Sequence, residues 1–221
     1  RPIAGLAGQV VYGLAVRPGQ TLHLQADIDR CDGEAVAYRG RATVDGELAV
    51  EINGCVGPML PMAQFDDPAA VRADFHTLMN EGAVAHRFTG VPAPDLSGIE
   101  VQGDEQLCAW LSVPSVAAAP YFDDHFPRRP VFPGTLLMDA LAGLALQLAR
   151  QSTPLRQVEA LVVSRVTHVK IRSFTEPGTR LHLQADRVEG DAQGVRLKLS
   201  ARADGKLVAT ARAEIVRTGQ G

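Results

Sequence analysis

The chain has 221 residues, of which 46% are hydrophobic and 21% are charged, with a net charge of −3 and a pI near 6.1. This composition is typical of a globular protein of one or two domains. The slightly acidic balance, without a Lys/Arg run, argues against nucleic-acid binding, and no apolar stretch is long enough to span a membrane.

The compartment is indicated by the N-terminus and the cysteines. The N-terminus has no charged region followed by an apolar core, as a signal peptide would have. Cys31, Cys55 and Cys108 are far apart, odd in number and without metal-binding spacing, so we expect reduced thiols. These features predict a cytoplasmic protein.

The first and last parts of the chain share an internal repeat. Residues 18–27 (PGQTLHLQAD) reappear as residues 177–186 (PGTRLHLQAD), and residues 42–48 resemble residues 201–207; both pairs are 159 positions apart. Each copy has a Pro-Gly turn, a strand with period-two alternation and an Asp-Gly hairpin. The repeat therefore predicts two copies of an antiparallel β unit.

A helical connector is predicted between the two copies, over residues 61–95. An Asp-Pro pair marks the start of a helix over residues 67–80, and Val71, Phe75 and Leu78 lie on one apolar stripe. We expect this stripe to pack against a neighbouring unit.

Residues 125–140, HFPRRPVFPGTLLMDA, are the most informative segment. They place a histidine, a Pro-Gly helix start and one carboxylate close together. Residues 135–149 are almost wholly apolar, so we expect a helix that is buried on every side, with Asp139 near its start. Burial would raise the pKa of Asp139, as an acid catalyst requires, although the helix N-terminus partly opposes this. Alternatively, Asp139 caps or pairs locally and His125 is an ordinary loop residue.

This segment resembles the active-site motif of the β-hydroxyacyl-acyl-carrier-protein dehydratases, roughly H-F-x-G-x-P-x-x-P-G-x-L-x-x-[DE]-A. The matching positions are His125, Phe126, Pro130, Pro133, Gly134, Leu136, Asp139 and Ala140. Two positions depart from the family pattern. Arg128 stands where glycine is usual, and Gly143 stands where a glutamine usually follows the acid by four residues.

The resemblance implies a hotdog fold of the α+β class, in which an antiparallel sheet wraps around a long buried helix. Residues 96–217 contain the elements of a complete hotdog dehydratase unit: the helix and strands near 107–113, 160–172, 180–187, 195–203 and 206–216. Residues 1–60 match only the C-terminal part of such a unit. We therefore expect tandem, pseudo-dimeric repeats with a truncated first repeat, and missing upstream sequence rather than a unit that has lost its helix, because a bare sheet face would have no core.

The tandem arrangement also resembles the dehydratase region of polyunsaturated-fatty-acid synthases and related polyketide-type megasynthases. That narrower resemblance rests on the repeat and on the connector sequence over residues 57–68. The N-terminal arginine is compatible with a piece of a larger polypeptide.

The dehydratase resemblance implies loss of water from a 3-hydroxyacyl thioester, which is carried on the phosphopantetheine of an acyl carrier protein, without a metal or further cofactor. His125 would remove the C2 proton, because the pKa of histidine is near neutrality, and Asp139 would protonate the leaving hydroxyl. The backbone N–H of Gly134, at the helix N-terminus, would receive charge that develops on the carbonyl. In enzymes with this motif, the histidine and the acid of one site come from different hotdog units.

The acyl tail would need an apolar tunnel beside the helix. Phe126, Phe132, Pro133 and Leu136 are the candidate substrate-binding residues. A core role is an equally good interpretation for either phenylalanine, because large apolar residues beside a helix usually pack internally.

The expected partners are an acyl carrier protein and a second hotdog unit, either in the same chain or in a homodimer. The Arg128-Arg129 pair is a candidate contact for a pantetheine phosphate or an acidic carrier protein, with a solvated loop as the alternative. Two other functions stay open: a hotdog acyl thioesterase, and a non-catalytic hotdog partner domain, which the departures at Arg128 and Gly143 favour.

Overall fold

The computed structural model describes residues 1–3, 5–82, 91, 94–153, 155–158 and 160–218. Two α-helices and ten strands occur in these residues, with short 3-10 helices between some of them. In chain order the elements are β1 (Leu6–Tyr12), β2 (His23–Cys31), β3 (Ala35–Val44), β4 (Glu47–Pro58), α1 (Pro68–Asn80), β5 (Leu96–Gln102), β6 (Gln106–Ser112), α2 (Gly134–Gln151), β7 (Leu161–Ile171), β8 (Arg180–Gly190), β9 (Gly194–Ala203) and β10 (Lys206–Arg217).

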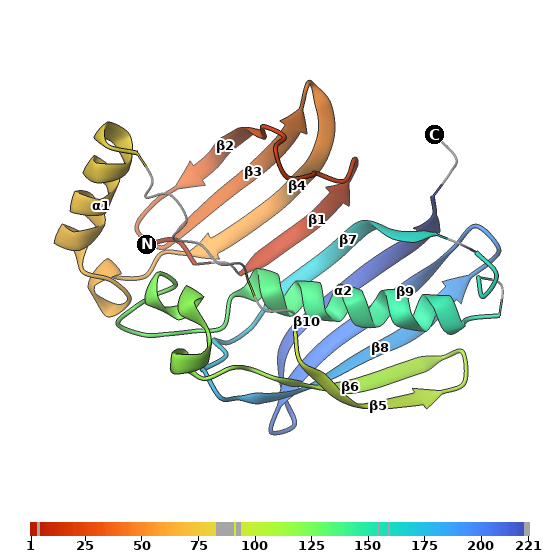
Figure 1. The fold of residues 1–221 in the computed structure, drawn as a ribbon. Helices are drawn as coiled ribbons and strands as arrows, with labels where there is room; N and C mark the ends of the chain where they lie inside the picture. The colour runs from red at the N-terminus through yellow and green to blue at the C-terminus, as the bar shows by residue number, and fades with distance from the viewer. Residues whose placement is uncertain (4, 83–90, 92–93, 154, 159, 219–221) are drawn as a thin grey trace.

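All ten strands form one sheet, in the order β2-β3-β4-β1-β7-β10-β9-β8-β6-β5. The antiparallel pair of β1 and β7, in which Val10 lies opposite Val166, joins the N-terminal four strands to the C-terminal six. In Figure 1 the long helix α2 crosses one face of the C-terminal part of the sheet. The N-terminal part carries no such helix among the described residues.

The predicted strands and turns of the two repeats are confirmed. The bounds of β3 and β4, shifted by 159 positions, are those of β9 and β10. Both Asp-Gly hairpins have positive φ at both central residues, for example 52° at Asp45 and 86° at Gly46, as a type I′ turn requires. The Pro-Gly turns are also alike, because Gly19 and Gly178 both have positive φ.

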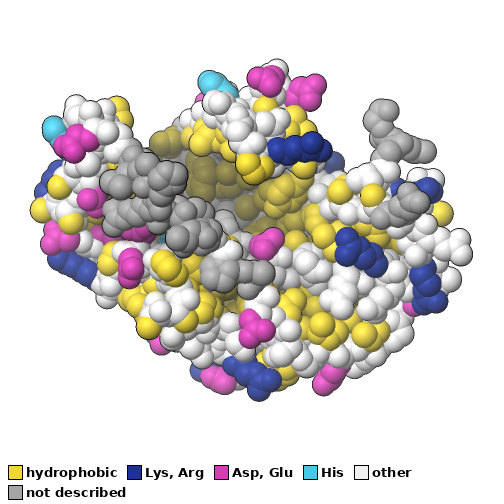
Figure 2. Space-filling view, viewed as in Figure 1, with side chains coloured by type: hydrophobic (Ala, Val, Ile, Leu, Met, Phe, Trp, Pro, Cys, Tyr) yellow, Lys and Arg dark blue, Asp and Glu magenta, His cyan; other side chains and the backbone are white. Residues whose placement is uncertain are grey.

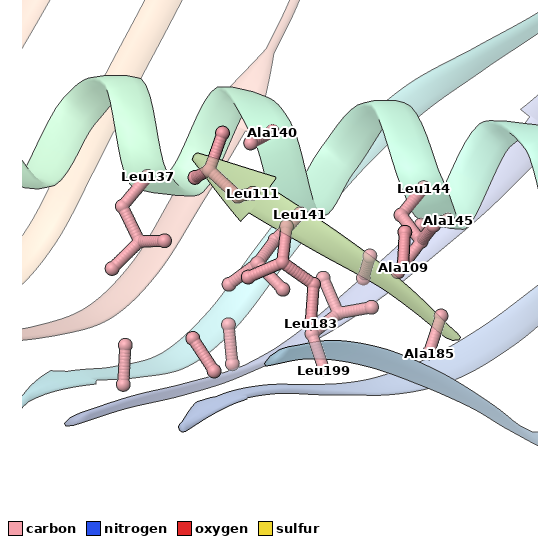
Figure 3. Packing of buried hydrophobic residues seen from close by; sticks show 14 of the residues in the cluster. Ala109, Leu111, Leu137, Ala140, Leu141, Leu144, Ala145, Leu183, Ala185 and Leu199 are labelled. Atoms are coloured by element: carbon pink, nitrogen blue, oxygen red, sulfur yellow. The ribbon is translucent and has the colours of Figure 1, made fainter. Parts of the chain in front are cut away.

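The main core lies between α2 and the sheet. Figure 3 shows Leu141 and Leu144 of α2 on the side of the helix that faces Leu183 and Leu199 of the sheet. All four side chains are at most 1% exposed. Burial of this apolar face against the sheet supplies most of the driving force for folding of the C-terminal part.

The expectation that this helix is buried on every side is wrong. Thr135, Asp139, Gly143 and Arg150 are exposed and lie along one side of α2. The sheet covers only the opposite side, where Leu and Ala repeat at helical spacing. Alanine and glycine on the open side make the helix sequence almost uniformly apolar, but such small residues do not need to be buried.

The N-terminal part of the sheet leaves an apolar face open. Leu24 and Ile28 of β2 are 72% and 66% exposed, whereas Leu183, which occupies the place of Leu24 in the repeat, is 0% exposed under α2. A shallow hollow of about 200 Å³ on this face is lined by Leu24, Ala26, Tyr38, Val50 and other residues of β2, β3 and β4. Figure 2 shows the hollowed, hydrophobic surface in this region.

The connector helix α1 begins and ends where the sequence predicts. The Asp67 side chain accepts hydrogen bonds from the backbone N–H groups of Ala69 and Ala70, and Pro68 occupies the first turn. The expectation that its apolar stripe packs on a neighbouring unit is wrong, because Phe75 and Leu78 are 65% and 57% exposed.

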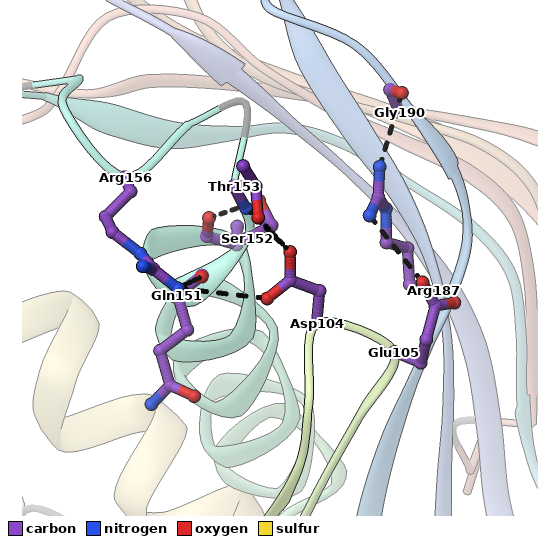
Figure 4. Close-up of polar contacts among 9 residues, drawn as sticks. Asp104, Glu105, Gln151, Ser152, Thr153, Arg156, Arg187 and Gly190 are labelled. Carbon is purple, nitrogen blue, oxygen red and sulfur yellow. Dashed lines mark hydrogen bonds and ion pairs between the residues drawn. The ribbon is translucent and has the colours of Figure 1, made fainter.

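The C-terminal end of α2 is fixed by a polar cluster, which Figure 4 shows. Asp104, in the turn between β5 and β6, accepts hydrogen bonds from the backbone N–H of Thr153, at 2.9 Å, and from its hydroxyl. These two hydrogen bonds lower the pKa of the Asp104 carboxyl. The turn therefore holds the end of the helix over the sheet.

Neither helix in the described part of the chain is long and apolar enough to cross a membrane.

Leu144→Ala should lower the free energy of unfolding by about 2–5 kcal/mol, because it leaves a cavity beneath α2. Leu78→Ala, at an exposed position of α1, should change it by less than about 0.5 kcal/mol. Urea unfolding followed by circular dichroism measures both. Similar losses in the two variants would contradict the assigned core.

Candidate functional site

His125 lies in the loop between a 3-10 helix, Pro120–Asp123, and α2. Its backbone N–H donates to the carbonyl oxygen of Tyr121 at 2.8 Å. The imidazole is half-buried, and its centroid lies 4.3 Å from that of the Phe126 ring. The loop therefore presents a histidine that is shielded on one side by an aromatic ring.

Burial lowers the pKa of His125 below its ordinary value, and the nearby positive charge of Arg1 lowers it further. The Arg1 guanidinium lies over the Phe126 ring, 4.5 Å from its centroid, and pairs with the buried carboxylate of Asp66. The imidazole is therefore neutral at neutral pH, which is the state that a general base requires.

The two candidate phenylalanines belong to different clusters. Phe126 packs with Ile3, Phe65 and Val131 in a small cluster that joins the N-terminal residues, the connector and the His125 loop. Phe132 belongs to the main core, and its backbone N–H donates to the Thr175 carbonyl oxygen at 2.7 Å. Both rings are less than 9% exposed.

Helix α2 begins at the Pro-Gly pair. The Pro133 carbonyl oxygen accepts from the backbone N–H groups of Leu136 and Leu137, at 3.0 and 3.1 Å, and Gly134 is the first helical residue. A Cβ atom on Gly134 would lie 3.6 Å from Cγ1 of Ile171, an ordinary contact distance. Contacts within the protein therefore do not require glycine at this position.

Asp139 is exposed on the open side of α2, so the expectation that it is buried is wrong. Burial raises the pKa of Tyr12, at the end of β1, and the negative charge of Asp139 raises it further. Asp139 therefore lies close to the N-terminal part of the sheet.

The structure gives His125 and Asp139 different neighbours. Among the described residues, neither a hydrogen bond nor an ion pair links the two side chains. His125 lies beside Arg1 and Asp139 beside Tyr12, so each faces residues from the beginning of the chain. The motif gave no indication of Arg1 or Tyr12, because both lie more than a hundred positions before it.

The two candidate arginines have different surroundings. The Arg128 guanidinium donates to the Asp67 carboxylate at 2.8 Å and to the Ala63 carbonyl oxygen at 3.2 Å. The Arg129 guanidinium lies over the Phe174 ring, 4.8 Å from its centroid. Arg128 is thus engaged with the connector, whereas Arg129 lies on an aromatic surface at the edge of the loop.

Residues 101–212, which contain the His125 loop, α2 and most of the C-terminal strands, match the family model described as ApeI-like, ApeI dehydratase. The match covers more than half of the chain. The chain belongs to the ApeI-like dehydratase family. The expected likeness to the hotdog dehydratases is thereby confirmed at the level of the family.

Curated relatives of this ApeI-like chain include 3-hydroxyacyl-[acyl-carrier-protein] dehydratases named FabZ. The protein from Thioalkalivibrio sulfidiphilus is 38% identical over 98 residues, which are 42% of this chain and 65% of the relative. The protein from Dechloromonas aromatica is 32% identical over 117 residues, 52% of this chain and 79% of the relative. The matches to the FabZ proteins of Protochlamydia amoebophila and Rickettsia bellii span only 58% and 62% of those relatives.

Solved structures resemble the whole ApeI-like chain in fold. The tesB protein of Mycobacterium avium subs paratuberculosis has a TM-score of 0.62 at 11% identity and covers 99% of this chain and 79% of its own. The acyl-CoA thioesterase II TesB2 of Mycobacterium marinum has a TM-score of 0.55 at 13% identity, with 99% and 83% covered. At these identities the likeness concerns the hotdog-type fold alone.

The folded state should bind a proton on His125 more weakly than the unfolded state does, because the folded pKa lies below the ordinary value of 6.5. The contribution of this group to stability is therefore complete above about pH 6.5 and is lost as the pH falls through the folded pKa. We expect His125→Gln to reduce the loss of unfolding free energy between about pH 7.5 and about pH 5.5. Urea unfolding at several pH values measures the loss, with His23→Gln at an exposed position as the control. An unchanged slope in His125→Gln would contradict the assignment.

Proposed function

We propose that the protein is a dehydratase that removes water from 3-hydroxyacyl thioesters and releases 2-enoyl thioesters, in fatty acid or polyketide biosynthesis. One observation carries the proposal. The family motif is present with its histidine held neutral in a half-buried loop, directly before the helix that carries the acid. The curated FabZ relatives, which are named as dehydratases of carrier-protein substrates, support the same reaction.

The proposed chemistry uses groups of this chain. His125 takes the proton from C2, and the electron pair of that C–H bond forms the C2–C3 double bond as the C3–O bond breaks. In the site that it serves, the Asp139 carboxyl passes a proton, directly or through a water, to the departing hydroxyl, which leaves as water; the proton that the base took from C2 replaces it in the next turnover. The backbone N–H of Gly134, at the positive end of α2, stabilises the charge on the thioester carbonyl in between.

We propose further that His125 and Asp139 serve different sites. The support is their separation, with His125 beside Arg1 and Asp139 beside Tyr12. His125 would then act with an acid on the helix of the first unit. Asp139 would act with a histidine of the first unit.

The corresponding domain assignment is also a proposal: residues 1–60 as the C-terminal part of a first hotdog unit, residues 61–95 as the connector and residues 96–217 as the complete dehydratase unit. The β1–β7 register supports it. Val10 opposite Val166 becomes Val169 opposite Ala7 when each residue is moved by 159 positions, and both pairs occur. Such self-consistency is expected of two copies related by a twofold axis.

The residues on the open face of strands β1 to β4 are suited to packing against a helix. Ala26 and Ala42 stand at the repeat positions of Ala185 and Ala201, which are 0% exposed beneath α2. Small residues at the centre of a sheet face permit the close approach of a helix backbone. We therefore propose that the first unit is completed by a helix like α2, as in the tandem dehydratase region of polyunsaturated-fatty-acid synthases or a related megasynthase.

The proposed partner is an acyl carrier protein, with the substrate on its phosphopantetheine. Arg129 is the candidate contact for the phosphate, because its exposed guanidinium lies at the loop that carries His125. The proposed lining of the acyl tunnel consists of Phe126, Phe132, Pro133 and Leu136. The packing of the two phenylalanines also supports a role in the hydrophobic clusters.

In the intact protein, the double variant His125→Ala with Asp139→Asn should lower the rate of dehydration by about a hundredfold or more, because it removes the base of one proposed site and the acid of the other. The rate is measured as the appearance of the conjugated enoyl thioester from a 3-hydroxyacyl-pantetheine substrate. His23→Ala, on an exposed strand residue, is the control and should keep the full rate.

The same assay separates the alternatives. A thioesterase would release a free thiol and a free acid without forming an enoyl product, whereas a non-catalytic partner domain would leave the substrate intact. Near-normal dehydration by the folded double variant would contradict the proposed mechanism.

If a helix covers the open face in the first unit, a fusion protein that supplies such a helix should expose less apolar surface. Residues 96–159 placed directly before residue 1 keep the repeat register, because residue 1 corresponds to residue 160. This fusion should bind much less of a fluorescent dye that detects exposed apolar surface than the 221-residue chain does.

The matched control is the same fusion with Leu141→Asp in the added copy only. It should keep the dye binding of the chain without the fusion, because a charge in the middle of the apolar helix face prevents docking. Equal dye binding by the chain and by the fusion would overturn the domain assignment.

A further inference from the structure

The connector between the two halves reaches the loop that carries His125. Phe65 follows the 3-10 helix Met62–Gln64 and is 0% exposed. Its ring meets Phe126 edge to face, with centroids 5.1 Å apart, and lies 5.7 Å from the Phe174 ring. Phe126 is the residue whose ring shields His125. One connector side chain is therefore a single contact away from the histidine.

Hydrogen bonds join the same two segments. The backbone N–H of Arg128 donates to the Phe65 carbonyl oxygen at 2.9 Å. The Arg128 guanidinium donates to Ala63 and Asp67, on either side of Phe65. Because the guanidinium and Asp67 are about half exposed, their ion pair is weak by itself. The buried Phe65 ring is therefore the main anchor, and Arg128, where the motif usually has glycine, reinforces it.

The backbone beside His125 needs such an anchor. Phe126 has a φ of 63°, in the left-handed region that a bulky side chain rarely adopts. A conformation of this kind persists only when its surroundings hold it. The surroundings of Phe126 are the small cluster with Ile3, Phe65 and Val131, which is separate from the core beneath α2.

We propose that Phe65 is a positioning residue for His125: it holds Phe126 in its left-handed conformation and thereby fixes the direction and shielding of the imidazole. The connector thus couples the N-terminal half to the base of the reaction. This inference rests on the proposed function for its effect on rate, but its effect on the His125 ring is independent of that function.

The test compares Phe65→Ala with Phe75→Ala, which makes the same change at an exposed position of α1. Both are made in protein that also carries Asp139→Asn, so that dehydration comes only from the proposed site of His125. Phe65→Ala should lower kcat about tenfold or more with little change in KM, because a misdirected base slows the proton transfer more than it weakens binding. Phe75→Ala should leave both constants unchanged. Phe65→Leu, which keeps an apolar filling, should restore most of kcat.

The second readout is the NMR titration of the His125 ring, assigned by its loss in His125→Ala. Loosening of Phe126 lets water reach the imidazole, so the midpoint should rise toward 6.5 in Phe65→Ala. The charged groups around the loop are Arg1 with its partner Asp66, Arg128 with its partner Asp67, Arg129, and Asp123 and Asp124 on the preceding segment. The variant changes none of them.

An unchanged midpoint in Phe65→Ala that keeps its circular dichroism spectrum would overturn the positioning role. If Phe65→Ala does not fold, the smaller truncation Phe65→Val decides: a midpoint and a kcat both identical to those of the protein with Phe65 overturn the proposal, and values shifted in the direction expected for Phe65→Ala support it. A shifted midpoint in a protein that dehydrates nothing would keep the positioning inference and refute the proposed function.

Discussion

The pairing of β1 with β7 is the constraint on which the site depends. Without it, each half of the sheet would end in a bare strand, with unpaired backbone N–H and C=O groups. The pairing satisfies the backbone groups of β1 and β7 that would otherwise be unpaired, and it fixes the two halves in one register. As a consequence, Tyr12 at the end of β1 lies near Asp139, and the residues before β1 lie against the His125 loop. The site is therefore a property of the joined sheet.

Local patterns in the sequence predicted most of the C-terminal half. Alternation, the Asp-Gly pair at residues 204–205 and the Pro-Gly pair at residues 177–178 predicted the strands from β7 to β10 within a few residues, because hairpin turns leave little freedom in register. The apolar run of α2 and the Asp-Pro start of α1 were equally clear. Strand β5 was not predicted as a strand. It is an edge strand with hardly any buried side chain, so it carries no alternation to detect.

The predictions of burial were wrong where burial depends on which other segment packs against the surface. An apolar stripe shows that a surface can be buried, but it does not show what covers it. Phe75 and Leu78 of α1 therefore remained exposed, and so did Asp139 on α2. The motif also could not predict contacts between parts of the chain that are distant in sequence. Phe65 and Arg1 reach the His125 loop because the sheet brings residues far apart in sequence together.

The proposed division of acid and base between two halves would have a physical advantage. A carboxylic acid in direct contact with a neutral imidazole would transfer its proton to the imidazole, and the resulting carboxylate would raise the pKa of the imidazole and cost the base its neutral form. Burial and the charge of Arg1 lower the pKa of the His125 imidazole, while Asp139 stands on the open side of α2. A strained residue that is held by the connector then makes the geometry of the base depend on the assembled halves. In an unassembled half, Phe126 would lose its contacts with Phe65 and Ile3, and only the contacts within its own loop would remain to hold its positive φ.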